Sequence, residues 1–256
     1  MEFIKVETAG PVTTVTLNRP EVMNAINPRM HQELQEAFDA FAADEAQFVC
    51  VVTGAGERAF CAGSDLKAAG ERHQYPKNGY AGLIERFDLN KPLIAAVNGL
   101  ALGGGFEVAL ACDIIIAASG ASFGLPEPLV GAVALGGGVH RLARQIGLKQ
   151  AMGLILSARR VSAEEGLRLG IVNEVAPAGE LGAVVERWAK EIMRGSPMAL
   201  RASKEAAMRG LDEPSLAEAI RNQADYPAFA AWRASEDAQE GPRAFAEKRA
   251  PAWKGR

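Results

Sequence analysis

The chain has 256 residues, of which 48% are hydrophobic and 23% are charged, which is typical of globular proteins. This length is enough for one large domain, or for a domain with a helical appendage. The formal net charge of −3 excludes a general electrostatic attraction to nucleic acids or anionic membranes, so we expect neither as a partner.

Short apolar and β-branched runs predict four strands in the first 120 residues, namely Val12–Leu17, Phe48–Thr53, Leu93–Val97 and Asp113–Ala117. The last three runs are nearly continuously apolar, which favours strands buried on both faces. Between the first two strands, Met30, Leu34, Phe38 and Phe41 recur at helical spacing, and Pro28 is well placed to begin that helix.

From about residue 140 onward, the pattern becomes mostly helical. Ser162 followed by two glutamates predicts a capped helix start. Pro197–Met208 and Pro214–Phe229 are predicted to be further helices, each opened by its proline. We therefore expect a mixed α/β core over residues 1–195 and a helical part over residues 196–256.

From the sequence we expect neither a targeting segment nor a membrane span. Residues 1–7 lack the basic and apolar regions of a secretory signal, and the best apolar stretch, 93–110, is interrupted by polar residues and four glycines. The chain contains three cysteines: Cys50, Cys61 and Cys112. None of their spacings fits a metal site, and their odd number favours a reducing compartment. We expect a cytoplasmic protein.

The most informative segment is Leu102–Asp113, in which three consecutive glycines precede an apolar run containing Glu107. Glycines leave the backbone open to close approach, and the first N–H groups of a helix have no partner inside it. Glu107 lies about one turn beyond Gly104, so its carboxylate and a free N–H share one face. A second acid, Glu127, follows the extended Pro126 turn. Buried carboxylates beside oriented N–H groups are what enolate chemistry requires.

A second small-residue loop, around residues 62–64, follows the predicted strand at 48–53. Ligand sites commonly form at the carboxyl ends of such strands. This loop and the one at 103–105 are each able to direct an N–H group at one thioester oxygen. Such a pair of donors stabilises an enolate, and the loss of one donor costs about 3 kcal/mol of transition-state stabilisation.

Three fragments resemble the signature loops of the crotonase superfamily: Phe60–Leu66, Asn98–Glu107 and Phe123–Glu127. Further segments, Arg19–Ala25 and Ala163–Asn173, extend the resemblance in order through essentially the whole chain. The resemblance implies an α/β fold, a crotonase-like spiral of ββα units with a helical C-terminal trimerisation region. It also implies a homotrimer or homohexamer.

The resemblance also implies roles for individual residues. Ser64 and Gly104 supply the N–H groups of an oxyanion hole, and Glu107 and Glu127 act on a catalytic water. Phe245 and Lys248 reach coenzyme A from a neighbouring subunit. The implied substrate and coenzyme A contacts are Val22, Ala25, Ala62, Ser64, Asp65, Leu66, Lys67, Gly104, Pro126, Phe245 and Lys248. No metal or separate cofactor is implied, since coenzyme A is part of the substrate.

Other residues favour structural roles. Asp113 ends the apolar helix and is expected to be a structural hydrogen-bonding residue. The three histidines share no metal-ligand spacing, and His31 and His73 lie in polar segments that we expect to be exposed. Gly136–Gly138 is predicted to open another helix, with close packing or substrate contact as alternative reasons for its glycines.

The leading hypothesis is an enoyl-CoA hydratase, a lyase that adds water reversibly to a trans-2-enoyl-CoA. Two carboxyl groups with different pKa values divide the tasks, Glu107 activating water and Glu127 protonating the α-carbon. Many hydratases have Pro and Gly where this chain has Ala134 and Leu135, which leaves acyl specificity open. The segments Ser64–Ala69, Glu240–Arg249 and Trp253–Arg256 also resemble carnitinyl-CoA dehydratases. The alternatives are that dehydratase, an enoyl-CoA isomerase, and a non-catalytic acyl-CoA- or RNA-binding relative.

Overall fold

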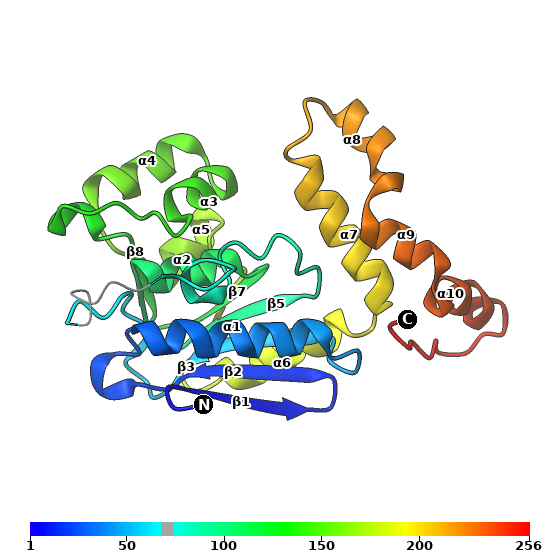
Figure 1. The fold of residues 1–256 in the computed structure, drawn as a ribbon, viewed down its shortest axis with the longest axis horizontal. Coiled ribbons are helices and arrows are strands. Elements are labelled where there is room, and N and C mark those ends of the chain that lie inside the picture. Colours follow the sequence, from blue (N-terminus) through cyan, green and yellow to red (C-terminus); the bar gives the residue numbers. More distant parts are fainter. Residues whose placement is uncertain (68–73) are drawn as a thin grey trace.

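The computed structural model describes residues 1–67 and 74–256, and two sheets organise it (Figure 1). The large sheet has the strand order β1 (Ile4–Ala9), β2 (Val12–Leu17), β3 (Val49–Gly54), β5 (Leu93–Val97), β7 (Ile114–Ala118) and β10 (Glu174–Ala176). The small sheet has the order β4 (Ala59–Cys61), β6 (Leu100–Leu102), β8 (Ser122–Gly124) and β9 (Val161–Ser162). Pairing is parallel except between β1 and β2 and between β8 and β9.

The chain alternates between the two sheets. Each of β3, β5 and β7 lies in the large sheet, and the strand that follows it lies in the small sheet. Helix α2 (Gly104–Ala111) follows the pair β5 and β6, which makes one ββα unit. The carboxyl ends of β4, β6 and β8 therefore meet at one edge, and both loops singled out in the sequence leave that edge.

The four predicted strands are confirmed to within one residue at each end. Their burial explains why their sequences are so apolar. All five residues of β5 are buried, because the strand pairs with β3 and β7 and is covered on both faces. One face packs on α1 (Pro28–Ala43), which begins at Pro28 behind the Asn27 cap and buries its apolar stripe. The other face packs on α6 (Leu181–Ile192).

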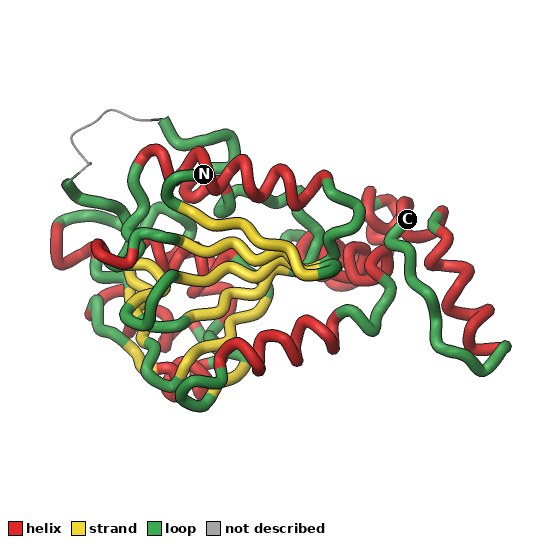
Figure 2. Tube along the Cα trace, turned by 90° about the horizontal axis from the view of Figure 1, so that it is seen from below, coloured by secondary structure: helices red, strands yellow, loops and turns green. Residues whose placement is uncertain are grey.

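The remaining helices frame this core. They are η1 (Pro20–Val22), η2 (Tyr80–Gly82), η3 (Glu127–Val130), α3 (Gly138–Gln145), α4 (Leu148–Ser157), α5 (Ala163–Leu169), α7 (Pro197–Gly210), α8 (Leu216–Asn222), η4 (Gln223–Asp225), α9 (Pro227–Ala234) and α10 (Glu236–Ala246). Helices α7 to α10 lie beyond one end of the large sheet in both views (Figures 1 and 2). No helix among the described residues has the length and apolar run needed to cross a bilayer.

Two expectations are wrong. Residues 214–229 do not form one helix from Pro214: Ser215 caps α8, and the chain becomes extended at Tyr226 before α9. Pro227 has no N–H to continue a helix, and it disfavours the helical conformation in the residue before it. His31 is only 2% exposed, since its ring packs edge-on against Tyr80 and its Nδ1 accepts from the Ala81 N–H. His73 lies outside the described residues.

Candidate active site

The glycine triplet makes the turn from β6 into α2, and each glycine leaves room for a different neighbour. A side-chain carbon on Gly103 would lie 3.0 Å from Glu127 Oε1, and one on Gly104 would lie 2.3 Å from the Tyr80 hydroxyl. One on Gly105 would lie 2.1 Å from the Cys61 carbonyl oxygen. The three glycines therefore allow Glu127, Tyr80 and the Cys61 backbone to pack closely against the start of α2.

The loop at 62–64 meets this helix start. Gly63 has a φ of +95°. A side-chain carbon at this position would lie 3.0 Å from the Leu102 carbonyl oxygen and 3.3 Å from the Gly104 nitrogen. The Gly63 carbonyl oxygen accepts from the Ile26 N–H at 2.8 Å, which holds the loop in place. Neither the Ser64 nor the Gly104 N–H has an acceptor among the described residues. The two expected donors thus lie on adjacent turns.

Glu107 is buried on the first turn of α2 and is 3% exposed. Its Oε1 accepts from the Gly138 N–H at 2.8 Å, and Gly136 packs directly on the carboxyl group. Burial raises the pKa of Glu107 to about 7, the Gly138 hydrogen bond opposes this rise, and the charge of Glu127 adds to it. The glycines at 136–138 open α3 as predicted, and they do so against this carboxyl group.

Glu127 begins η3 after Pro126 and lies across the same helix start. Its Oε2 is buried and has no hydrogen-bond partner among the described residues. Burial raises the pKa of Glu127 as well. Because each carboxylate favours protonation of the other, the pair holds a proton more readily than two ordinary glutamates do.

Tyr80 is the site residue that sequence reasoning missed. Its buried hydroxyl accepts from the Ser64 hydroxyl at 3.3 Å and lies against Gly104. Burial raises the pKa of Tyr80 well above its ordinary value, so the phenol is neutral. No motif marks it, since Tyr80 reaches the site only because η2 packs between α1 and α2.

The expected coenzyme A contacts on the core lie on neighbouring loops. Arg19 joins two of these loops: its Nη1 donates to the Ala25 carbonyl oxygen at 2.7 Å and to Asp65 Oδ2 at 2.9 Å. The Ala62 N–H donates to the Met23 carbonyl oxygen, beside Val22. Leu66 and Lys67 are exposed at the end of the loop.

The two expected tail contacts are not brought to these loops within the chain. Phe245 is 87% exposed on α10, and Lys248 follows that helix. Helix α10 lies at the far end of the molecule from α2 (Figure 1). A role for this tail in coenzyme A binding therefore requires a second subunit.

Asp113 is structural, as expected. Its Oδ2 accepts from the Leu93 N–H at 2.7 Å and from Lys204 Nζ at 2.8 Å, so it ties β5 to α7.

Strands that alternate between two sheets, with two carboxyl groups at a glycine-lined helix start, define the crotonase class of fold. The chain matches the Enoyl-CoA hydratase/isomerase family over residues 7–256. It is therefore a member of this family and has a hydratase or dehydratase (lyase) activity.

Similar proteins carry two kinds of name. Carnitinyl-CoA dehydratase of Proteus mirabilis is 44% identical over 100% of this chain and 99% of its own. The structure of an enoyl-CoA hydratase from Mycobacterium tuberculosis is 37% identical, with a TM-score of 0.93 and 100% of both chains covered. That of a carnitinyl-CoA hydratase from Mycobacterium avium is 41% identical, with a TM-score of 0.79 over 100% of both chains.

Proposed function

We propose that the protein adds water reversibly to the double bond of trans-2-enoyl-CoA thioesters. The observation that carries this proposal is the pair Glu107 and Glu127 at the start of α2, beside two N–H groups that have no acceptor in the described part of the chain. Glu107 is buried, and Glu127 has one buried carboxylate oxygen without a partner among the same residues. This combination suits a reaction that needs a base, an acid and an anion site within one small volume.

The N–H groups of Ser64 and Gly104 are proposed to hold the thioester carbonyl oxygen. As water adds to the β-carbon, negative charge moves onto that oxygen, and both donors stabilise it at the helix start. Gly63 supports this role, because any side chain there would press on the Leu102 carbonyl oxygen and the Gly104 nitrogen. The donors are held by the fold before the substrate arrives.

The two glutamates are proposed to divide the proton transfers. The Glu107 carboxylate takes a proton from water as its oxygen attacks the β-carbon, and the Glu127 carboxylic acid gives its proton to the α-carbon. One proton then returns from Glu107 to Glu127 to complete the cycle. A pKa of about 7 makes Glu107 a stronger base than an ordinary glutamate, and burial raises the pKa of Glu127 as well, which suits an acid.

The relatives' names favour a second candidate. Proteins called carnitinyl-CoA dehydratase are 44% identical over the whole chain, and the same two glutamates would serve the removal of water from a 3-hydroxyacyl-CoA. The two candidates differ in the acyl group and not in the site chemistry. A comparison of kcat/KM for crotonyl-CoA, longer and branched enoyl-CoAs, and carnitinyl-CoA separates them.

The proposal is tested by following the loss of the enoyl absorbance in the wild type, Glu107→Gln and Glu127→Gln. Hydration in heavy-oxygen water labels the product, whereas an isomerase incorporates no label. Wild-type turnover in either glutamine variant would refute the assignment of that glutamate. A filter-binding salt titration with RNA tests the non-catalytic alternative, since binding through phosphate contacts weakens steeply with salt.

We further propose that subunits associate as a trimer or a dimer of trimers, with Phe245 and Lys248 completing the coenzyme A groove of a neighbour. The exposure of Phe245 supports this, because a large aromatic side chain is costly to leave in water. Sedimentation analysis tests the assembly, and a strict monomer would rule it out.

A further inference from the structure

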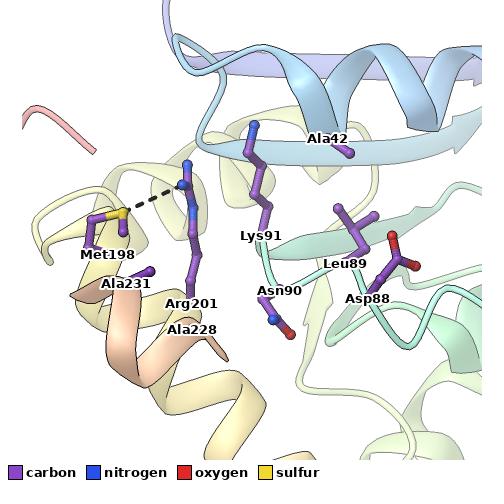
Figure 3. Close-up of a pocket in the computed structure, with 9 residues that line it drawn as sticks. All are labelled: Ala42, Asp88, Leu89, Asn90, Lys91, Met198, Arg201, Ala228 and Ala231. Atoms are coloured by element: carbon purple, nitrogen blue, oxygen red, sulfur yellow. Dashed lines mark hydrogen bonds between the residues drawn. The ribbon is translucent and has the colours of Figure 1, made fainter. Parts of the chain in front are cut away.

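A cavity that neither glutamate lines lies where the helical part meets the core. Its volume is about 220 Å³. The core contributes the end of α1 and the loop before β5, and the helical part contributes α7 and α9 (Figure 3). Two cationic side chains line it: Lys91 from the core and Arg201 from α7.

Neither cation has an acidic partner among the described residues; Lys91 is buried and Arg201 is half-buried. Lys91 is 5% exposed, and its Nζ donates to the carbonyl oxygens of Phe41 and Asp44, each at 2.7 Å. Arg201 Nη1 reaches only the Met198 sulfur, at 3.6 Å, and Arg201 Nη2 is buried with no acceptor among the described residues. A buried guanidinium nitrogen without an acceptor is rare and costly in folded proteins.

The two cations also act on each other. Figure 3 shows their charged ends pointing to the same side of the cavity. Burial and the Arg201 charge together lower the pKa of Lys91 to about 8, although the charges of Asp44 and Glu45 oppose this. Burial likewise lowers the pKa of Arg201. Two like charges held together away from water are stabilised by an anion between them.

The nearby acids do not fill this role. Asp88 lines the cavity, but its carboxylate pairs with Arg86 at 3.1 Å, and in Figure 3 it lies away from the two cationic ends. Asp237 acts on Arg201 only over a distance, since its carboxylate accepts from the Ser196 hydroxyl and the Lys254 N–H. Glu45 is exposed.

We propose that this cavity binds a small oxyanion, a phosphate or a carboxylate, between Arg201 and Lys91. The fork of Arg201 and the ammonium group of Lys91 provide donors suited to such oxygens. Because one cation belongs to the core and the other to α7, the bound anion joins the helical part to the core. The site is independent of the proposed reaction and of the two glutamates.

The test is thermal unfolding of the full chain in sodium phosphate, in sodium acetate and in sodium chloride of equal ionic strength. Phosphate or acetate at about ten times its Kd is expected to raise the Tm of the wild type by about 3 °C over chloride. Arg201→Met and Arg201→Gln are expected to lose this rise. Arg233→Met, which removes an exposed arginine from α9, is expected to keep it.

The two anions distinguish the sources of the ligand: a rise with only one of them identifies its chemistry, and a rise with both supports a general oxyanion site. No rise in the wild type with either anion overturns the proposal, as does an equal rise in the Arg201 variants. A third result would also overturn it. If the Arg201 variants change the sedimentation of the protein while neither anion alters the wild-type Tm, a carboxylate of a second copy fills the cavity instead.

Discussion

Replacing Glu107 by Gln is expected to raise the free energy of unfolding at alkaline pH, because the ionised carboxylate of Glu107 is unfavourable in its buried position. The pKa of this carboxyl group is about 7 in the folded protein against 4.5 for an ordinary glutamate. The difference corresponds to about 3 kcal/mol of unfolding free energy. Since the folded pKa is the higher one, this stability is fully present below pH 4.5 and is lost as the pH rises through about 7. Gln cannot ionise, and its oxygen keeps an acceptor for the Gly138 N–H.

Urea unfolding of both proteins at several pH values between 5 and 8.5, at one protein concentration, measures this effect. The stability of Glu107→Gln relative to the wild type is expected to grow by about 3 kcal/mol across that range, while hydratase activity falls. The exposed α1 variant Glu36→Gln is the control for the loss of one negative charge. A difference that stays constant with pH would show that Glu107 ionises as easily in the folded protein as in the unfolded one.

Three further outcomes follow from the site. Glu127→Gln is expected to lower kcat at least about 100-fold with unchanged circular dichroism, and a variant keeping a tenth of the activity would exclude proton transfer by this group. Gly104→Ala sets a carbon 2.3 Å from the Tyr80 hydroxyl and is expected to lower both kcat/KM and Tm. Tyr80→Phe is expected to lose at most about tenfold in kcat/KM. Equal effects of the two substitutions would contradict the packing of Tyr80 against Gly104. Phe245→Ala is expected to raise KM for an acyl-CoA but not for the same acyl group on a short cysteamine thioester, and equal KM changes would argue against coenzyme A contact.

Much of the secondary structure was predictable, because its signals lie between close neighbours in the chain. The alternation in β2, the continuous apolar run in β5 and the 3.6-residue stripe of α1 each report local burial. The same local reasoning failed at residues 214–229, where Pro227 breaks the helix inside an otherwise helical pattern. It also failed at His31, because no local pattern shows that η2 covers this side chain.

The sequence by itself determined the chemical groups of the candidate site: two acids, two glycine-rich loops and the family to which these motifs belong. Only the tertiary structure decided how those groups are held. Gly138 meets Glu107 from 31 residues away, and Tyr80 reaches Ser64 across 16. Arg201 on α7 lines the same cavity as Lys91 of the core. Such contacts arise when separate elements pack to bury their apolar faces, so the pKa of a carboxyl group or the partner of a guanidinium depends on neighbours that no local pattern specifies.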